Sequence, residues 1–126
     1  MSNEPTREII NEAICVFMGW EFIKVDEDFY HALFEGNLMW ADNRKGLNKT
    51  LLEGFKYHSS WDWLMPVVLK AKALYLNYET GQMRDELKMR YKAIENELCN
   101  LNLINTHYCL YKFLQWYNKA KEVTNG

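Results

Sequence analysis

The residues best suited to chemistry stand close together at His58, Ser59, Ser60 and Asp62. An imidazole, two hydroxyls and a carboxylate over five positions could transfer protons, with His58 as general base and Asp62 orienting its ring. The same residue types also begin helices, because Ser caps free backbone N–H groups and Asp in the first turn complements their partial charge. We favour the capping role and keep His58 and Asp62 as candidate catalytic residues.

Enzyme signatures are otherwise missing from the chain. It contains no GxxxxGK[ST], GxGxxG, GxSxG or HExxH motif, so phosphate loops, dinucleotide folds, serine-hydrolase elbows and zinc-protease sites lack their usual marks. The cysteines Cys15, Cys99 and Cys109 have no CxxC spacing. Cys99, His107 and Cys109 could meet around zinc, but they are scattered over two predicted helices without the paired spacing of a zinc site. We therefore expect a protein that is not an enzyme, with no cofactor and no metal.

Aromatic residues make up 15% of the chain, which is more than an interior of this size needs. Trp and Tyr combine apolar area with a polar group and often anchor binding surfaces, although a bulky core would use the same residues. Trp61 and Trp63 point about 200° apart on a helix, so one of them is expected at the surface. The candidate binding residues are Tyr57, His58, Ser59, Trp61, Trp63, Trp116 and Tyr117.

Charge and hydropathy restrict the partners. The net charge is −2 and no basic block occurs, which argues against a nucleic-acid partner. No apolar stretch approaches the ~20 residues that span a bilayer, and the N-terminal residues lack the pattern of a signal peptide. We expect a cytoplasmic protein with no membrane partner.

Length and periodicity predict a single domain over 1–126, with flexible tails near 1–4 and 122–126. The fold class is mainly α, or α+β with a small minor sheet, with about four helices around one core. The helices are expected near 5–18, 60–77, 82–100 and 103–121. The third helix has an inward stripe of Met83, Leu87, Tyr91, Ile94, Leu98 and Leu101. Pro66 implies a kink in the second helix or a short turn before a helix that begins near Met65.

The segment between the first two helices is harder to interpret. Trp20–Val25 alternates imperfectly, as a short strand or an extended segment would, and the acidic run Asp26–Asp28 indicates a solvated turn. Glycines interrupt 29–55, so we expect short elements and turns there, with Leu38–Ala41 as the best strand candidate. Ala73–Tyr78 could be the end of a helix or a strand, and we favour helix.

The last helix is apolar or aromatic on more than half of its circumference. A band this wide needs cover on more than one side. A two-fold dimer could supply it, since such a dimer uses one surface twice. Alternatively, residues 29–55 could fold over the helix within one chain. We favour the homodimer. The band comprises Leu103, Tyr108, Leu110, Tyr111, Phe113, Leu114, Trp116 and Tyr117.

Three blocks of the chain resemble one family. Tyr57–Val68 (YHSSWDWLMPVV), Ile14–Trp20 and Tyr111–Asn118 resemble small uncharacterised proteins of bacteriophages and prophages, especially those of Bacteroidetes. Related phage domains are α/β/α sandwiches, so the resemblance implies a sheet. Between Leu69 and Asn100 this sequence departs from the family pattern, because a charged helix is expected there. The family has no assigned activity, so no catalytic residue is transferred.

Together these observations predict a phage-type accessory protein that acts by binding. Its partner would be a host or defence protein that it blocks, or a small nucleotide-like signal that it sequesters. The alternatives are a small enzyme that processes nucleotides or nucleic acid, with His58 as base, and a virion or assembly component.

Overall fold

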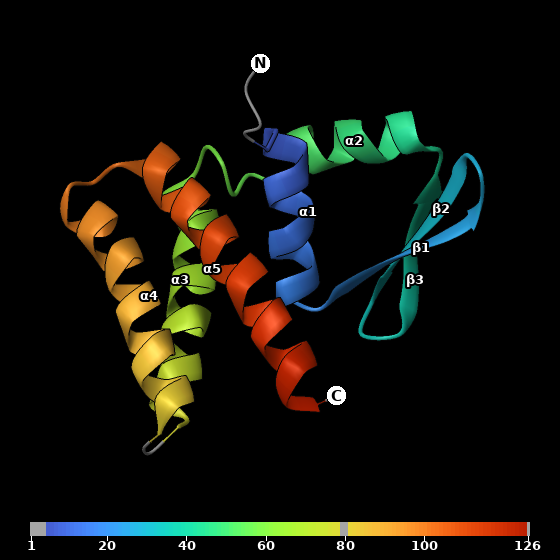
Figure 1. Ribbon diagram of the computed structural model, residues 1–126. Helices are drawn as coiled ribbons and strands as arrows, with labels where there is room; N and C mark the ends of the chain where they lie inside the picture. Colours follow the sequence, from blue (N-terminus) through green and yellow to red (C-terminus); the bar gives the residue numbers. More distant parts are fainter. Residues whose placement is uncertain (1–4, 79–80, 126) are drawn as a thin grey trace. The chain divides into compact units, whose positions relative to one another are not determined.

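Over residues 5–78 and 81–125, which the structure describes, this computed structural model contains five helices and one three-stranded antiparallel sheet (Figure 1). The predicted fold class is confirmed in its α+β form with a small minor sheet. The chain divides into two compact units, Met1–Lys56 (unit 1) and Tyr57–Gly126 (unit 2). That the whole chain acts as one domain stays a prediction.

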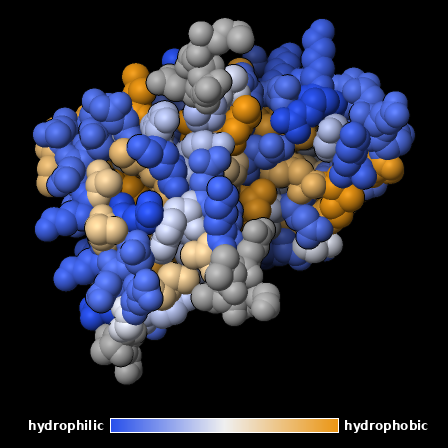
Figure 2. Space-filling model, in the orientation of Figure 1, coloured by the Kyte–Doolittle hydropathy of each residue, from blue (hydrophilic) through white to orange (hydrophobic). Residues whose placement is uncertain are grey.

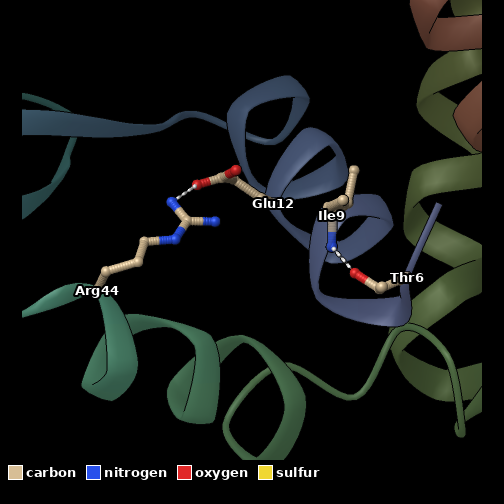
Figure 3. Close-up of polar contacts among 4 residues, drawn as sticks. All are labelled: Thr6, Ile9, Glu12 and Arg44. Atoms are coloured by element: carbon tan, nitrogen blue, oxygen red, sulfur yellow. Dashed lines mark hydrogen bonds and ion pairs between the residues drawn. The ribbon is translucent and has the colours of Figure 1, made fainter.

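Unit 1 begins with α1 (Arg7–Phe17), which confirms the first predicted helix. The side-chain oxygen of Thr6 accepts a hydrogen bond from the backbone N–H of Ile9 at 3.3 Å and caps the first turn (Figure 3). The chain leaves the helix at Gly19, whose φ of 113° suits glycine and strains residues with a Cβ. Both ends of α1 therefore follow from local sequence signals.

A meander of three strands follows. β1 (Trp20–Asp26), β2 (Phe29–Phe34) and β3 (Asn37–Asp42) pair in chain order. The turn between β2 and β3 is Glu35–Gly36, and both residues have positive φ, 53° and 86°, as in the type I′ turns that match strand twist. The strand predictions at Trp20–Val25 and Leu38–Ala41 are confirmed, whereas β2 was not predicted.

The helix α2 (Arg44–Glu53) packs on one face of this sheet. The side-chain oxygen of Asn43 accepts from the N–H of Gly46 at 2.8 Å and caps the helix. Arg44 Nη1 lies 3.1 Å from Glu12 Oε1 on α1 (Figure 3). The guanidinium of Arg44 also lies 5.6 Å from the ring centroid of Tyr30 on β2. One arginine thus connects both helices and the sheet.

A second link between α1 and α2 comes from the buried side chain of Asn11. The amide nitrogen of Asn11 donates to the carbonyl oxygens of Leu51 at 2.6 Å and Phe55 at 3.0 Å. Leu51 is in the last turn of α2, where carbonyls lack partners within the helix, and Phe55 follows the end of the helix, so this side chain satisfies one carbonyl of the helix end and one just beyond it.

Unit 2 consists of three helices that run side by side, α3 (Trp61–Leu76), α4 (Gln82–Cys99) and α5 (Leu103–Asn125) (Figure 1). The predicted helices at 60–77, 82–100 and 103–121 are confirmed, and α5 extends through four residues of the predicted tail. Residues 1–4 and 126 lie outside the described part. The buried apolar residues are Tyr57, Leu64, Val67, Val68, Ala71, Leu87, Tyr91, Ile94, Leu110, Phe113 and Leu114.

Two ambiguities of α3 are thereby decided. The helix is continuous through Pro66, so the alternative of a turn followed by a helix from Met65 is wrong. Ala73–Leu76 belongs to the same helix, so the helical interpretation is confirmed there. The expectation of short elements over 29–55 holds for the strands but misses α2, a helix of ten residues.

Candidate functional site

The predicted binding residues around the start of α3 separate into pairs. The ring of Tyr57, which is 6% exposed, meets the ring of Trp63 edge to face at a centroid distance of 5.4 Å. His58 faces His107 of α5, with ring centroids 6.1 Å apart. His107 is buried and Ser59 is exposed. This block therefore joins α3 to α5.

The cap of α3 differs from the prediction. Ser60 occupies the N-cap position, but its side chain makes no capping hydrogen bond. Asp62 lies exposed in the first turn, where its charge complements the helix dipole. The catalytic roles of His58 and Asp62 stay predictions.

A pocket of about 320 Å³ lies where α3 begins and α4 ends. Its walls are the side chains of Trp61 and Met65 from α3, Leu98 from α4, and Leu101 from the α4–α5 connection. All four are apolar, and the first three are half-buried. Of the predicted binding residues, Trp61 is the one that lines this pocket.

Leu101 departs most from its expected place. Its stripe position predicted an inward side chain, but the residue lies beyond the end of α4 and is 80% exposed. Its φ is 55°, a left-handed conformation that glycine usually supplies at this point of a helix end. The prediction is wrong because the helical period ends at Cys99, two residues before Leu101.

Hydrogen bonds define this connection closely. The N–H of Leu101 donates to the carbonyl of Leu98 at 2.9 Å, and the N–H of Asn102 donates to that of Glu97 at 3.1 Å. This pair of bonds is the Schellman motif. Asn102 also caps α5, because its side-chain oxygen accepts from the N–H of Asn105 at 2.9 Å, as its predicted capping role requires. The backbone that carries Leu101 is thus held from both helices.

The remaining predicted residues lie farther along α5. Trp116 is nine positions from His107, or about 13 Å along the helix axis, so the seven residues do not form one site. The guanidinium of Arg90 lies 4.7 Å from the Trp116 ring, and Tyr117 stacks on Phe113 at 6.4 Å. Burial, and secondarily Tyr78, raises the pKa of Tyr117.

Beside this region a groove of about 310 Å³ runs between α4 and α5. Arg90 and Lys112 supply its positive charge, and its other lining residues are Met89, Ala93, Cys109 and Phe113. Burial, and to a lesser extent Glu97, raises the pKa of Cys109 against the opposing effect of Lys112. The groove could therefore accommodate an anion with an apolar body, and its cysteine stays a neutral thiol.

A third hollow, of about 560 Å³, follows α2 in unit 1. Charged side chains of both signs line it, including Asp42, Lys45, Lys49 and Glu53. Across the described ranges 5–78 and 81–125, no cluster of three or more His, Cys, Asp or Glu could hold a metal ion. Within the same residues, no helix is both long and apolar enough to cross a bilayer.

The sequence signal for the pocket was incomplete. Trp61 was identifiable from its type and position, but Met65 and Leu98 read as ordinary core residues of periodic helices. Leu101 could have been found only by recognising that a Leu precedes the capping residue Asn102 in place of the usual glycine. No family model matches this chain, and neither the curated proteins nor the solved structures that were compared with it give a match.

Proposed function

We propose that this protein acts by binding and not by catalysis, as a phage-type accessory protein that blocks a host or defence protein in the host cytoplasm. The contact surface is the apolar pocket of Trp61, Met65, Leu98 and Leu101. The single observation that carries the proposal is Leu101, held in a left-handed conformation with 80% of its surface exposed.

Neither conformation nor burial explains a leucine at that position. A left-handed backbone costs an L-residue with a Cβ about 1 kcal/mol, which glycine would avoid. A side chain that is 80% exposed recovers little of this through burial. Such strain persists at sites where a protein engages a partner. We infer that the leucine contributes to binding and not to folding.

The chemistry of the pocket favours a protein over a nucleotide. Its four lining side chains are apolar and offer no charge-assisted bond to a phosphate. A volume of about 320 Å³ suits one large apolar side chain of a partner. Ile104, in the first turn of α5, is 70% exposed and extends the apolar surface near Leu101.

The test compares Leu101→Gly with Leu69→Gln as a matched control. Leu69 is 59% exposed on α3 and lines none of the pockets described above. The full chain captures proteins from a bacterial extract, the captured protein is identified and purified, and its Kd is measured for each variant. We expect Leu101→Gly to weaken binding about tenfold or more and Leu69→Gln to leave it unchanged. The proposal is contradicted if both variants lose the same affinity for the captured protein, or if neither variant loses affinity.

A second candidate is the sequestering of a small nucleotide-like signal, and the groove of Arg90 and Lys112 favours it. Arg90 is pre-oriented by Trp116, so a phosphate would meet an arranged guanidinium. Nucleoside mono- and diphosphates should then raise the melting temperature of the protein, and Arg90→Gln with Lys112→Gln should remove that shift.

The alternatives predict other results. An enzyme would turn over members of a nucleotide library, and the double replacement of His58 and Asp62 by Ala would abolish that activity. A virion component would co-sediment with phage particles. Either result would replace the binding proposal.

A further inference from the structure

The sheet of unit 1 has one covered face. On that face Tyr30 lies beneath Arg44, Ala32 is 2% exposed, and the Trp20 ring meets Phe55 edge to face at 5.2 Å. Alternation along the strands places these three sheet residues on one side. Their alternate neighbours must therefore point to the other side, here called the open face.

The open face is unusually apolar for a surface. By the register it carries Ile23 of β1, Phe29 and Leu33 of β2, and Leu38 of β3, with His31 at its centre. Leu33 pairs directly with Leu38, and the rings of Phe29 and His31 meet at 5.5 Å. Ile23 is 40%, Phe29 39% and Leu38 59% exposed. A solvated sheet face is usually polar, so this one has the composition of a contact surface.

Hydrophobic atoms are also visible at the surface over the strands of unit 1, at the right of Figure 2. In that view they lie among hydrophilic atoms, as the centre of a contact surface lies within a polar rim.

The rim of the open face is strongly acidic. Between Trp20 and Asp42 the chain has six carboxylates and one lysine, a net charge of −5 in a chain whose total is −2. Three of these carboxylates are Asp26 at the end of β1 and Glu27 and Asp28 in the β1–β2 turn, and Glu35 lies in the β2–β3 turn. Lys24 and one carboxylate, Asp42, both pair with Tyr30 and so belong to the covered face.

This charge decides what the open face can bind. Phosphates of nucleic acids and anionic lipids would be repelled. A second copy placed sheet to sheet would bring two acidic rims together. Strand addition at the sheet edges is also disfavoured, because the pairing shifts within both edge strands, at Val25 of β1 and Met39 of β3. A helix laid across the face needs no free edge.

We propose that the open face of this sheet binds an amphipathic basic helix of a partner protein. The apolar side chains of that helix would contact Ile23, Leu33 and Leu38, and its Lys or Arg side chains would face the acidic turns. The arrangement would bury the apolar side chains of the open face, as elements with an apolar face require. This surface belongs to unit 1 and does not depend on the Leu101 pocket of unit 2.

The probe is a short labelled peptide in which leucine follows the helical period and lysine fills the other positions. Its binding to the full chain is measured by fluorescence anisotropy, beside a peptide with glutamate in place of lysine. We expect the lysine peptide to bind and the glutamate peptide not to bind. We also expect affinity to fall as salt is added, since salt screens the acidic rim.

Two double variants locate the site. Ile23→Thr with Leu38→Thr keeps β-propensity while removing apolar surface. Glu27→Lys with Asp28→Lys reverses the charge of one exposed turn. Each should weaken the binding of the lysine peptide about tenfold or more. Leu69 is 59% exposed, as Leu38 is, so Leu69→Gln is a matched control. This variant and Leu101→Gly should bind the lysine peptide as the unaltered chain does.

Four results would overturn the proposal: equal binding of both peptides, unchanged binding by the charge-reversed variant, equal loss in the Leu69→Gln control, or a dimer that Ile23→Thr with Leu38→Thr dissociates. The last would show that a second copy occupies the face. Should the threonine pair prevent folding, the charge-reversed pair decides alone.

Discussion

Single residues in this protein show where local preference and structure disagree. Leu101 and Glu35 are the non-glycine residues with positive φ in the described part of the chain. At Leu101 the Schellman hydrogen bonds of the α4 end impose the conformation. At Glu35 the two-residue turn imposes it. Each position therefore has a substitution that should relieve strain.

Leu101→Gly should leave the free energy of unfolding unchanged or raise it by about 1 kcal/mol. Relief of the left-handed strain opposes the greater unfolded-state entropy of glycine, and little buried area is lost at 80% exposure. Leu101→Val should lower stability, because a β-branched residue fits this conformation worse. Urea unfolding measures both. A clear loss of stability in the glycine variant would mean that the side chain serves folding.

The buried Cys15 and the exposed Cys99 should differ in reactivity. Burial, with a smaller effect of Glu12, raises the pKa of Cys15 far above its usual range, whereas Cys99 is exposed. Since the thiolate is the reactive form, a disulfide reagent should modify Cys99 first and Cys15 only after unfolding. Raising the pH from 7 to 9 should leave Cys15 slow to react, because burial raises the pKa of its thiol.

The same shift makes stability depend on pH. The folded pKa of Cys15 exceeds its unfolded value of about 8.5, so its contribution is intact below that pH and declines as pH rises further. In the modification experiment, the fast-reacting thiol should disappear in the variant Cys99→Ser, which would confirm that it is Cys99. A fast-reacting thiol that persists in this variant would contradict that identification.

At the scale of elements, the β2–β3 hairpin depends on a glutamate in a turn that prefers asparagine. Type I′ turns need positive φ at both central residues, and Asn-Gly is their preferred pair. Glu35→Asn should therefore raise the free energy of unfolding by about 0.5 to 1 kcal/mol. Thermal melting provides the measurement, with Glu27→Asn in the other turn as control. No gain over the control would argue against the I′ assignment.

The α1–α2 link depends on Asn11, so Asn11→Ala should lower the free energy of unfolding by about 2 to 4 kcal/mol. The buried carbonyl of Leu51 and the partly buried carbonyl of Phe55 would lose their donor. A matched control is Asn48→Ala on α2, because the side-chain oxygen of Asn48 is buried and has no hydrogen-bond partner among the described residues. We expect that variant to be neutral or more stable. Equal losses in the two variants would contradict the role of Asn11.

The elements differ in how far the sequence predicts them. α4 could be predicted because its apolar residues recur with the helical period. The buried residues Leu87, Tyr91 and Ile94 lie on the stripe that this period defines. β2 was not, because Phe29–Phe34 has apolar or aromatic residues on both faces and shows no alternation. α2 has few apolar residues and a glycine in its first turn, and its packing against the sheet overrides these weak preferences.

The candidate site was less predictable than the fold. Trp61 was identified from its residue type, yet its partners Leu98, near the end of α4, and Leu101, in the α4–α5 connection, lie some 40 residues away in the sequence. Periodicity assigns faces within a helix but does not show which helix ends meet. The open face of the sheet was hidden for the same reason, because it depends on the register of three strands.

For the whole molecule, we expect a two-fold homodimer through α5, with a mass twice the 15.1 kDa of the chain in light scattering. Leu110, Phe113 and Leu114 are buried, whereas Trp116 and Tyr117 keep part of their rings at the surface. Trp116→Ala or Tyr117→Ala should shift the mass toward the monomer, and Lys119→Ala, at an exposed position, should not. A mass near 15.1 kDa in every variant would show that no dimer forms.

The short connection between α4 and α5 also bears on the order of folding. Asn102 donates its N–H to the end of α4, while its side-chain oxygen and carbonyl accept from the start of α5. Since three residues separate the helices, closing this loop loses little chain entropy. Contacts near in sequence form fastest, so we expect this helical hairpin to form early and α3 to pack onto it afterwards. One asparagine would then influence the rate at which unit 2 folds as well as its final stability.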